Sequence, residues 1–408
     1  MNTAAQYAKR KLTGLVNRLR VLFFGLSSHP AFKSMVERNF YKGAAETFFQ
    51  DALDSAVARN AADCYDIEKP GIAIYEFKGW DCPKFVNSAK TVVRADELPA
   101  CAKADCAIVF GHSADPGNVK TLAAAIAGNV PVVLAEDGFI KSADTWANRS
   151  APERFRRSCS LVQDTKGLYY DATVATDIEG MLNNPEIKVS EKDCEQALRL
   201  IRKIVDNKIT KYNHQPIFVP DVGRTGRRKV LVIDQSYGDF SIPRGWGSDD
   251  LFARMLEDAV KENPDADVLV KTHPDTMTGA RKGYYDDLVD HDNVFRVTMP
   301  INPYSLMDVV DKVYVCSTQF GFEALMAGKE VHVYGMPFYA GWGITVDKQS
   351  NPRRTNRRSL PEIFHIFYVR YTHWMDPETG EKWTLDQAID YMIRLRQEYD
   401  AFRKAAKA

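Results

Sequence analysis

Three clusters of polar side chains could do chemistry, and each follows an apolar run that is typical of a β-strand. The clusters are Asp234–Asp239, Lys271–Asp275 and Ser317–Gln319, and the runs before them are Val230–Ile233, Val268–Val270 and Val313–Cys316. In a doubly wound α/β sheet, ligands bind at the carboxyl ends of the strands. One such cluster alone is how a loop ordinarily begins, but three on adjacent elements predict a functional site.

The first two clusters contain groups suited to catalysis. Lys271 and His273 are two residues apart on an extended segment, so both side chains can point the same way. Lysine would offset the charge of a phosphate or carboxylate, and histidine could donate or shuttle a proton. Asp239 follows Gly238, which permits close approach of a substrate. A carboxylate exposed in such a loop can act as a nucleophile or a base.

The third cluster suits an anion. Ser317 and Thr318 stand at a predicted helix start, where hydroxyls and backbone N–H groups could hold a nucleotide phosphate. The alternative is an ordinary N-cap. Glu323 lies four residues after Gln319 on the same helix face and could accept hydrogen bonds from ribose hydroxyls. The alternative for Glu323 is a solvated helix charge, which its apolar neighbours disfavour.

The first half of the chain offers one comparable cluster. Glu136 and Asp137 directly follow the apolar run Val130–Ala135. One carboxylate from each half would give the acid and nucleophile that retaining glycosyl chemistry uses. The sequence has no His-rich tract, no P-loop and no GxGxxG after a strand, so we predict no metal site and no dinucleotide cofactor.

An aromatic segment, Met336–Gly343, is the remaining candidate. Its aromatic residues between glycines fit a loop that closes over a ligand, and the alternative is a packed turn.

The elements that must position these residues alternate between strand and helix. The first half contains four predicted strands, at Ile72–Glu76, Lys90–Val93, Cys106–Phe110 and Val130–Ala135. A predicted helix, Asn118–Ala127, lies between the last two strands and gives a βαβ pattern. The second half begins again after the polar, glycine-containing stretch Asp221–Arg228, with a helix at Asp249–Glu262 and further strands at Val294–Val297 and Val331–Tyr334. We therefore predict an α/β protein with two consecutive doubly wound units, at residues 1–220 and 228–380. A C-terminal helix over 381–408 carries a capping box at Thr384 and Gln387.

Composition narrows the function and the compartment. The 408 residues carry 54 basic and 54 acidic side chains, which argues against nucleic acid as a partner. The seven cysteines form no CxxC pair, so a reducing cytoplasmic location is expected. Leu12–Leu26 has helical apolar spacing with basic residues interspersed. This helix could lie on the anionic inner-membrane surface, or it could be a packed helix with a solvated basic face.

Together the clusters resemble the capsule polysaccharide synthesis proteins of the KpsC type. The resemblance spans about Glu136 to Gly380 and includes Gln319–Leu325, Phe338–Gly343 and Asp376–Gly380. It implies a GT-B-like fold, with two Rossmann-like domains facing a central cleft and the C-terminal helix packing back on the N-terminal domain. It also implies a retaining β-Kdo transferase that uses CMP-β-Kdo as donor substrate and needs no cofactor.

The resemblance assigns roles residue by residue. Asp239 matches the nucleophile, Glu136 the acid and His273 a residue that contacts the donor. The expected donor-binding residues are Gln235, Lys271, Asn302, Ser317, Thr318, Gln319 and Glu323. Two features depart from the family pattern: Lys141 stands where an arginine is expected, and the chain has room for one transferase module rather than two.

The acceptor is left open between a lipid-linked Kdo and another sugar of a surface polysaccharide. Two other functions are weighed beside Kdo transfer. One is a GT-B transferase that uses a different nucleotide sugar, and the other is a non-catalytic capsule export component.

Overall fold

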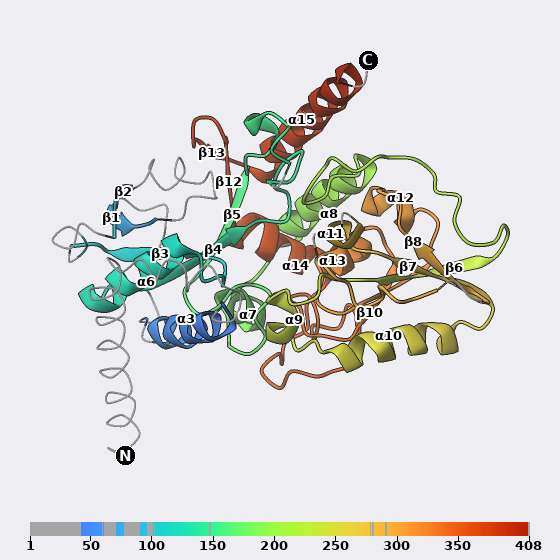
Figure 1. Cartoon of the computed structure of the whole chain (residues 1–408), viewed down its shortest axis with the longest axis horizontal. Helices are drawn as coiled ribbons and strands as arrows, with labels where there is room; N and C mark the ends of the chain where they lie inside the picture. The colour runs from blue at the N-terminus through green and yellow to red at the C-terminus, as the bar shows by residue number, and fades with distance from the viewer. Residues whose placement is uncertain are drawn as a thin grey trace. The chain divides into compact units, whose positions relative to one another are not determined.

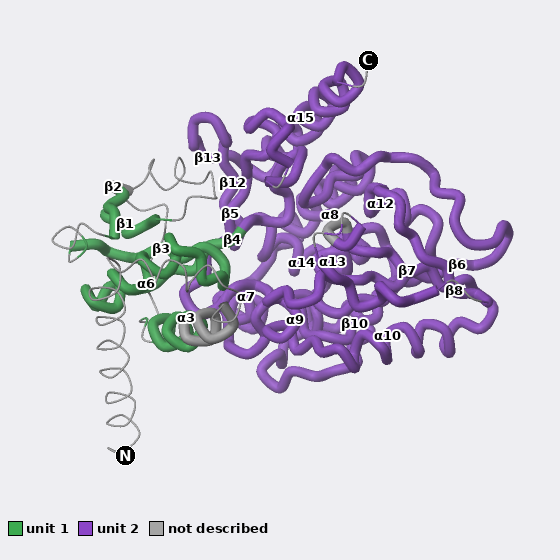
Figure 2. Tube along the Cα trace, viewed as in Figure 1, with its two compact units in different colours: residues 1–136 green, residues 137–408 purple. Residues whose placement is uncertain are grey.

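The computed structural model describes residues 42–58, 60, 71–76, 90–95, 101, 103–146, 148–277, 279, 281–289 and 292–406. The predicted N-terminal helix, Leu12–Leu26, lies outside these residues. The chain forms two compact units, Met1–Glu136 and Asp137–Ala408 (Figure 2). This division by compactness does not test the predicted domain boundaries at residues 220 and 228, which stay predictions.

Unit 1 contains a parallel sheet. The strands β1 (Gly71–Ile74), β2 (Lys90–Val93), β3 (Cys106–Phe110) and β4 (Val132–Asp137) lie in the order β2-β1-β3-β4. Helix α6 (Pro116–Gly128) connects β3 to β4, with Asp115 capping its start and Asn129 in the left-handed region at its end. Helix α3 (Lys42–Val57) precedes the strands. The βαβ unit predicted for this half is confirmed.

Unit 2 contains a six-stranded parallel sheet, which lies at the right of Figure 1. Its strands run in the order β11-β10-β9-β6-β7-β8. Their bounds are β6 Arg228–Ile233, β7 Ala266–Lys271, β8 Val294–Val297, β9 Lys312–Val315, β10 Glu330–Val333 and β11 Val346–Asp347. The strands read as apolar runs because helices such as α10 (Asp249–Glu262), α12 (Pro303–Met307) and α13 (Phe320–Met326) cover them. The register that pairs Ile233 with Lys271 brings the ends of β6 and β7 level.

The rest of unit 2 includes elements that the sequence did not predict. Strands β5 (Ser160–Asp164), β12 (Thr372–Met375) and β13 (Lys382–Trp383) pair antiparallel. Unit 2 also contains several short helices: η1 (Glu153–Phe155), α7 (Asp177–Asn183), α9 (Ser241–Arg244), α11 (Pro274–Met277), α14 (Leu360–Phe364) and the π-helical turn η2 (His365–Tyr371).

Two long helices complete unit 2. The C-terminal helix α15 (Leu385–Ala405) has the capping box predicted at Thr384 and Gln387. It packs on α8 (Glu191–Asp206), on β12 and on β13. Helix α8 lies within residues 1–220, which the sequence assigned to the N-terminal domain, and in the structure it belongs to unit 2 together with α15.

The aromatic segment Met336–Gly343 belongs to the core. Phe338, Tyr339 and Trp342 are each at most 2% exposed. The Phe338 ring stacks on Phe367 at 4.1 Å, and Trp342 Nε1 donates to the Phe338 carbonyl. The prediction of a loop that closes over a ligand is therefore wrong, and the packed turn describes this segment.

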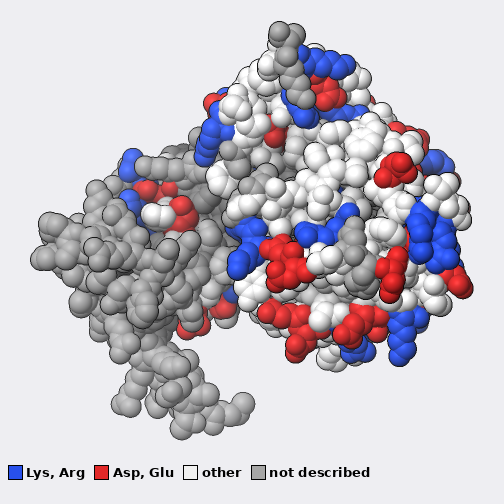
Figure 3. All heavy atoms as spheres, turned by 45° about the vertical axis from the view of Figure 1, so that its right-hand side comes forward, with Lys and Arg blue, Asp and Glu red and all other residues white. Residues whose placement is uncertain are grey.

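One face of unit 2 carries no single dominant charge. Figure 3 shows acidic and basic side chains intermixed on one face. Cys159, Cys194 and Cys316 are free cysteines. Within the described part of the chain, no helix combines the length and apolar character needed to cross a bilayer.

Candidate functional site

A pocket of about 670 Å³ opens in unit 2 at the carboxyl ends of β6 and β7. Six of the residues that the sequence singled out line it, together with Asp234. The six are Asp239, Lys271, His273, Thr318, Gln319 and Glu323. Polar ends of separate strands thus converge on one cavity, as expected for an α/β sheet.

Asp234 directly follows β6 and carries a buried carboxylate. Its Oδ1 accepts hydrogen bonds from the backbone N–H groups of Gln235 and Tyr284. Its Oδ2 has no hydrogen-bond partner among the described residues, and burial raises the pKa of this carboxyl to about 6. Gly283 makes the arrangement possible, because a Cβ there would come within 2.1 Å of Asp234 Oδ2.

Lys271 brings a buried amine to the same pocket. Its Nζ donates to the Thr272 carbonyl at 2.9 Å and contacts Met277 Sδ at 3.4 Å. Burial lowers the pKa of Lys271 to about 8, against the opposing attraction of Asp234. The pocket therefore holds a cation whose charge depends on pH near neutrality.

His273 is oriented by a residue that the sequence did not single out for a role. Ser236 Oγ lies 3.0 Å from His273 Nδ1, within hydrogen-bond distance. Both residues follow strand ends, Ser236 after β6 and His273 after β7. The serine fixes the plane of the imidazole ring that faces the pocket.

Asp239 is the most accessible of these carboxylates, with a side chain 43% exposed. Its Oδ1 accepts the Ser241 N–H at 2.9 Å, and its Oδ2 lies 3.8 Å from Arg281 Nη1. These contacts orient the carboxylate without burying it. Such a group can reach a substrate atom in the pocket.

The loop that carries Asp239 is anchored behind the pocket. Helix α9 follows the loop and ends at Arg244, which forms an ion pair with the buried carboxylate of Asp171. The Arg244 carbonyl also accepts the Ala172 N–H at 2.8 Å, and Arg353 Nη2 donates to the Ala172 carbonyl. Arg353 in turn binds Glu179, so the anchor continues into the core.

Ser317 and Thr318 make the contacts of a structured turn. The Gln235 side chain accepts the Ser317 N–H at 2.9 Å and donates to Ser317 Oγ. Thr318 Oγ1 accepts the Phe320 N–H at 3.3 Å, as a capping residue would. Gln235 and Ser317 are buried and do not line the pocket. Their role in donor binding stays a prediction.

Glu323 is buried in α13 and is not a solvated helix charge. Its Oε1 accepts hydrogen bonds from Thr210 Oγ1 and from Gln319 Nε2. Burial raises the pKa of Glu323 to about 7, and these donors partly oppose the shift. Gln319 also donates to the Phe139 carbonyl at 2.9 Å. The pair therefore ties α13 to two other segments at the pocket wall.

Two further predicted residues are not among those that line the pocket. Asn302 caps α12, accepting the Tyr304 N–H and donating to the Lys208 carbonyl, and it does not line the pocket. Glu136 lies in unit 1 and is the second-last residue of β4. Lys141, at the position where the family pattern has an arginine, forms a buried ion pair with Asp137 at 2.6 Å. The roles predicted for Asn302 and Glu136 are untested.

Other pocket residues were missed by sequence reasoning. The segment Thr210–Gln215 lines one wall except for Asn213, and Trp146, 55% exposed, lines the pocket beside it. Arg281 also lines the pocket. None follows a strand end of the second sheet. The only available signal was the clustering of His, Gln and Tyr between Tyr212 and Gln215 just ahead of the predicted linker.

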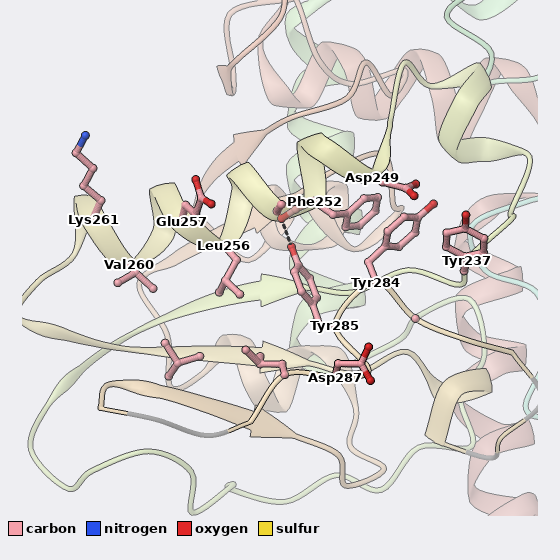
Figure 4. A pocket seen from close by; sticks show the side chains of 14 residues that line it. Tyr237, Asp249, Phe252, Leu256, Glu257, Val260, Lys261, Tyr284, Tyr285 and Asp287 are labelled. Atoms are coloured by element: carbon pink, nitrogen blue, oxygen red, sulfur yellow. Dashed lines mark hydrogen bonds between the residues drawn. The ribbon is translucent and has the colours of Figure 1, made fainter.

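A separate groove of about 730 Å³ lies between α10 and the segment Gly283–Leu288. Figure 4 shows Tyr284 flat against Phe252, with ring centroids 3.7 Å apart, and the Tyr285 hydroxyl donating to the Phe252 carbonyl. Its walls are largely apolar, with Asp249 and Lys261 at its rim. It contains none of the predicted site residues.

The described residues contain no cluster of three or more His, Cys, Asp or Glu side chains that could hold a metal ion. Asp265 and Asp267 are two residues apart, but Asp267 is bound by Arg224 through Oδ1 at 2.5 Å. The ion pair between Arg224 and Asp267 lies at the start of β7.

The two sheets and the pocket at the strand ends define an α/β protein of the GT-B type. Two solved structures share the architecture. One, "Thermosulfurimonas dismutans KpsC, beta Kdo 2,4 transferase", has a TM-score of 0.70 and 32% identity and matches 81% of this chain and 99% of that chain. The corresponding 2,7 transferase has a TM-score of 0.57 and 26% identity, over 80% of this chain and 99% of that chain.

The chain belongs to the KpsC-type capsule polysaccharide biosynthesis family. The family model "Capsule polysaccharide biosynthesis protein" matches residues 195–373. The capsule polysaccharide modification protein LipA of Neisseria meningitidis is 34% identical over 304 residues, 72% of this chain and 42% of LipA. The lipopolysaccharide-processing protein LpsZ of Rhizobium meliloti is 32% identical, over 65% of this chain and 59% of LpsZ. This chain thus spans about two fifths of LipA.

Proposed function

We propose that the chain is a glycosyltransferase that transfers Kdo from CMP-β-Kdo to a saccharide or lipid-linked acceptor in capsule or surface polysaccharide synthesis. The observation that carries the proposal is the convergence of Asp239, Lys271, His273 and Glu323 on one pocket at the strand ends. The β-Kdo transferase activity named for both Thermosulfurimonas structures supports Kdo as the sugar.

In the proposed reaction, Asp239 forms a bond to the anomeric carbon while the bond to the CMP phosphate breaks. The phosphate leaves with the bonding electron pair, and Lys271 offsets its charge. An acceptor hydroxyl then attacks the same carbon from the opposite face, its proton passes to a base, and the Asp239 carboxylate leaves with its electron pair. Two inversions retain the configuration of the donor.

The remaining residues are assigned supporting roles. His273, oriented by Ser236, would contact the donor phosphate. Thr318 and Gln319 border the pocket where the nucleotide would lie, and no cofactor takes part. Glu136 is proposed as the acid and base partner, on the family resemblance.

Nucleotide binding tests the donor. Calorimetric titration of the full chain with CMP, UMP and GDP should give tight binding for CMP only. Tight binding of UMP or GDP instead would identify a transferase with another nucleotide sugar. Absence of binding for all three would favour the non-catalytic export component.

Transfer from CMP-Kdo tests the chemistry. Asp239→Ala should abolish transfer to any acceptor that the unaltered chain uses, because no other described carboxylate of the pocket is as accessible. Asp249→Asn, on the exposed first turn of α10, is the matched control and should leave transfer unchanged. Intact transfer in Asp239→Ala would sink the double-displacement mechanism.

Peripheral binding to the inner membrane from the cytoplasm is proposed from the basic amphipathic stretch Leu12–Leu26. The full chain should sediment with anionic vesicles, and a chain that lacks the residues before Pro30 should not. Equal binding by the shortened chain would make this stretch merely structural.

A further inference from the structure

A second recess, of about 800 Å³, opens beside the pocket at the ends of β7 and β8. Three cations line it, Arg281, Lys282 and Arg296. It also holds one carboxylate, Asp286, and threonine hydroxyls that include Thr276. Nothing in the proposed reaction uses Lys282, Arg296 or Asp286.

The cations are held in different ways. Arg296 Nη1 donates to the carbonyls of Asp286 and Leu288, both at 3.2 Å, which fixes its guanidinium on β8. Lys282 is tied through its backbone, because its carbonyl accepts the Tyr237 N–H at 2.7 Å, and its side chain is exposed. The recess therefore combines a rigid cation with an adaptable one.

Two oxygens of the recess lack hydrogen bonds. Thr276 Oγ1 and Asp286 Oδ1 are buried and have no partner among the described residues, while Asp286 Oδ2 accepts the Gly283 N–H at 3.0 Å. A buried polar atom without a partner is costly unless a ligand or water supplies one.

These groups discriminate between classes of anion. Three cations against one carboxylate favour a negative ligand. A phosphate dianion offers only acceptors and would leave Asp286 Oδ1 facing like charge. A sugar acid offers a carboxylate for the cations and hydroxyl donors for Asp286. We propose that this recess is a subsite for a sugar acid, with the carboxylate against Lys282 and Arg296 and a hydroxyl on Asp286.

The location connects the recess to the pocket. Arg281 and Thr272 line both, and Arg281 Nη1 is 3.8 Å from Asp239 Oδ2. A sugar acid in the recess would therefore lie next to the proposed nucleophile. The identity of the molecule that carries this sugar acid, donor or acceptor, rests on the proposed function. In a Kdo donor the carboxylate is attached to the anomeric carbon itself, and an acceptor that ends in a sugar acid carries the same group.

Direct binding tests the recess without any transfer. The full chain is titrated with free Kdo, with its methyl ester and with inorganic phosphate, followed by ligand-observed NMR. Free Kdo should bind, the methyl ester should bind roughly tenfold more weakly, and phosphate should not compete. Lys282→Gln should weaken Kdo binding roughly fivefold. Lys261→Gln, an exposed lysine of α10 at the other groove, is the matched control and should change nothing.

Several results would overturn the proposal. They are no saturable binding of free Kdo, equal binding of acid and ester, or Lys282→Gln behaving as the unaltered chain. Thr276→Val, which removes a buried hydroxyl at constant volume, is the second variant and should also weaken Kdo binding. CMP affinity should stay the same in both variants, and a parallel loss of CMP would assign the recess to the nucleotide.

Steady-state kinetics separates the two sources. In Lys282→Gln, a higher KM for CMP-Kdo alone identifies the donor, and a higher KM for the acceptor alone identifies the acceptor. If neither KM changes, the recess does not serve transfer and the proposal fails. If the chain binds no CMP and transfers nothing, while its binding of free Kdo still depends on Lys282, the proposed function fails and the subsite stands.

Discussion

Lys271 gives nucleotide binding a pH dependence that can be worked out from its surroundings. Burial lowers the pKa of its amine from an ordinary 10.5 to about 8. The group is only 8% exposed, and its described contacts are a carbonyl and a thioether rather than a carboxylate. An anionic phosphate would be the first strong acceptor for this ammonium.

The magnitude follows from the protonated fraction. With a pKa of about 8, about nine tenths of the amines are charged at pH 7 and about one tenth at pH 9. The second pKa of a phosphate monoester is about 6, so the charge of CMP is constant over this range. If only the ammonium binds phosphate, the Kd for CMP should rise about tenfold between pH 7 and pH 9. Calorimetry at constant ionic strength measures this change.

Two variants isolate the amine. Lys271→Arg keeps its charge at every pH tested, so its Kd should be flat between pH 7 and pH 9. Lys271→Met should bind CMP weakly and also without pH dependence. A flat profile for the unaltered chain, or a parallel fall in Lys271→Arg, would refute the assignment of Lys271 to the phosphate.

Three further predictions concern stability. Burial raises the pKa of Glu323 from 4.5 to about 7, so the folded state binds the extra proton and loses stability as the pH rises through that window. Glu323→Gln should therefore be more stable than the unaltered chain by about 2–3 kcal/mol at pH 8 and equally stable below pH 4.5. Urea unfolding at the two pH values measures the difference. Gly283→Ala should lower the free energy of unfolding by about 1–3 kcal/mol, because its Cβ would meet Asp234 Oδ2 at 2.1 Å. Gly180→Ala is the control and should not lower it, since no atom lies within 4 Å of the added Cβ. A larger loss of stability in Gly180→Ala would contradict the close packing described at Gly283. Arg354→Met should cost about 1–3 kcal/mol in thermal unfolding, because it removes one of the two arginines that pair with the buried Glu179 carboxylate and takes a donor from the Pro337 and Ala340 carbonyls, and an unchanged Tm would disprove this.

Much of the fold follows from local pattern. The bounds of β2, β8 and α10 agree with the prediction to the residue, because each is an apolar run or amphipathic stretch with clear flanking residues. The antiparallel set was missed, since Ser160–Asp164 is short and partly polar. It becomes a strand only through pairing with Thr372–Trp374, far along the chain. Such pairing is a property of tertiary structure.

The sequence predicted the location of the site better than it predicted the role of each residue. Polar residues at strand ends located the pocket, with Asp239 and Lys271 both lining it. The same residue types also serve the scaffold: Gln235 clamps the turn at Ser317, and Asn302 caps a helix. Spacing does not distinguish a side chain that waits for a ligand from one whose partners are already in the protein.

The anchor behind the Asp239 loop offers a spectroscopic reporter. The Ala172 amide is protected by a single hydrogen bond to the Arg244 carbonyl at 2.8 Å, five residues after Asp239. Its hydrogen-exchange rate therefore measures how often that loop detaches from the body of unit 2. A ligand that settles against the loop should slow exchange at this one amide, so occupancy of the site could be followed at a position that touches neither substrate.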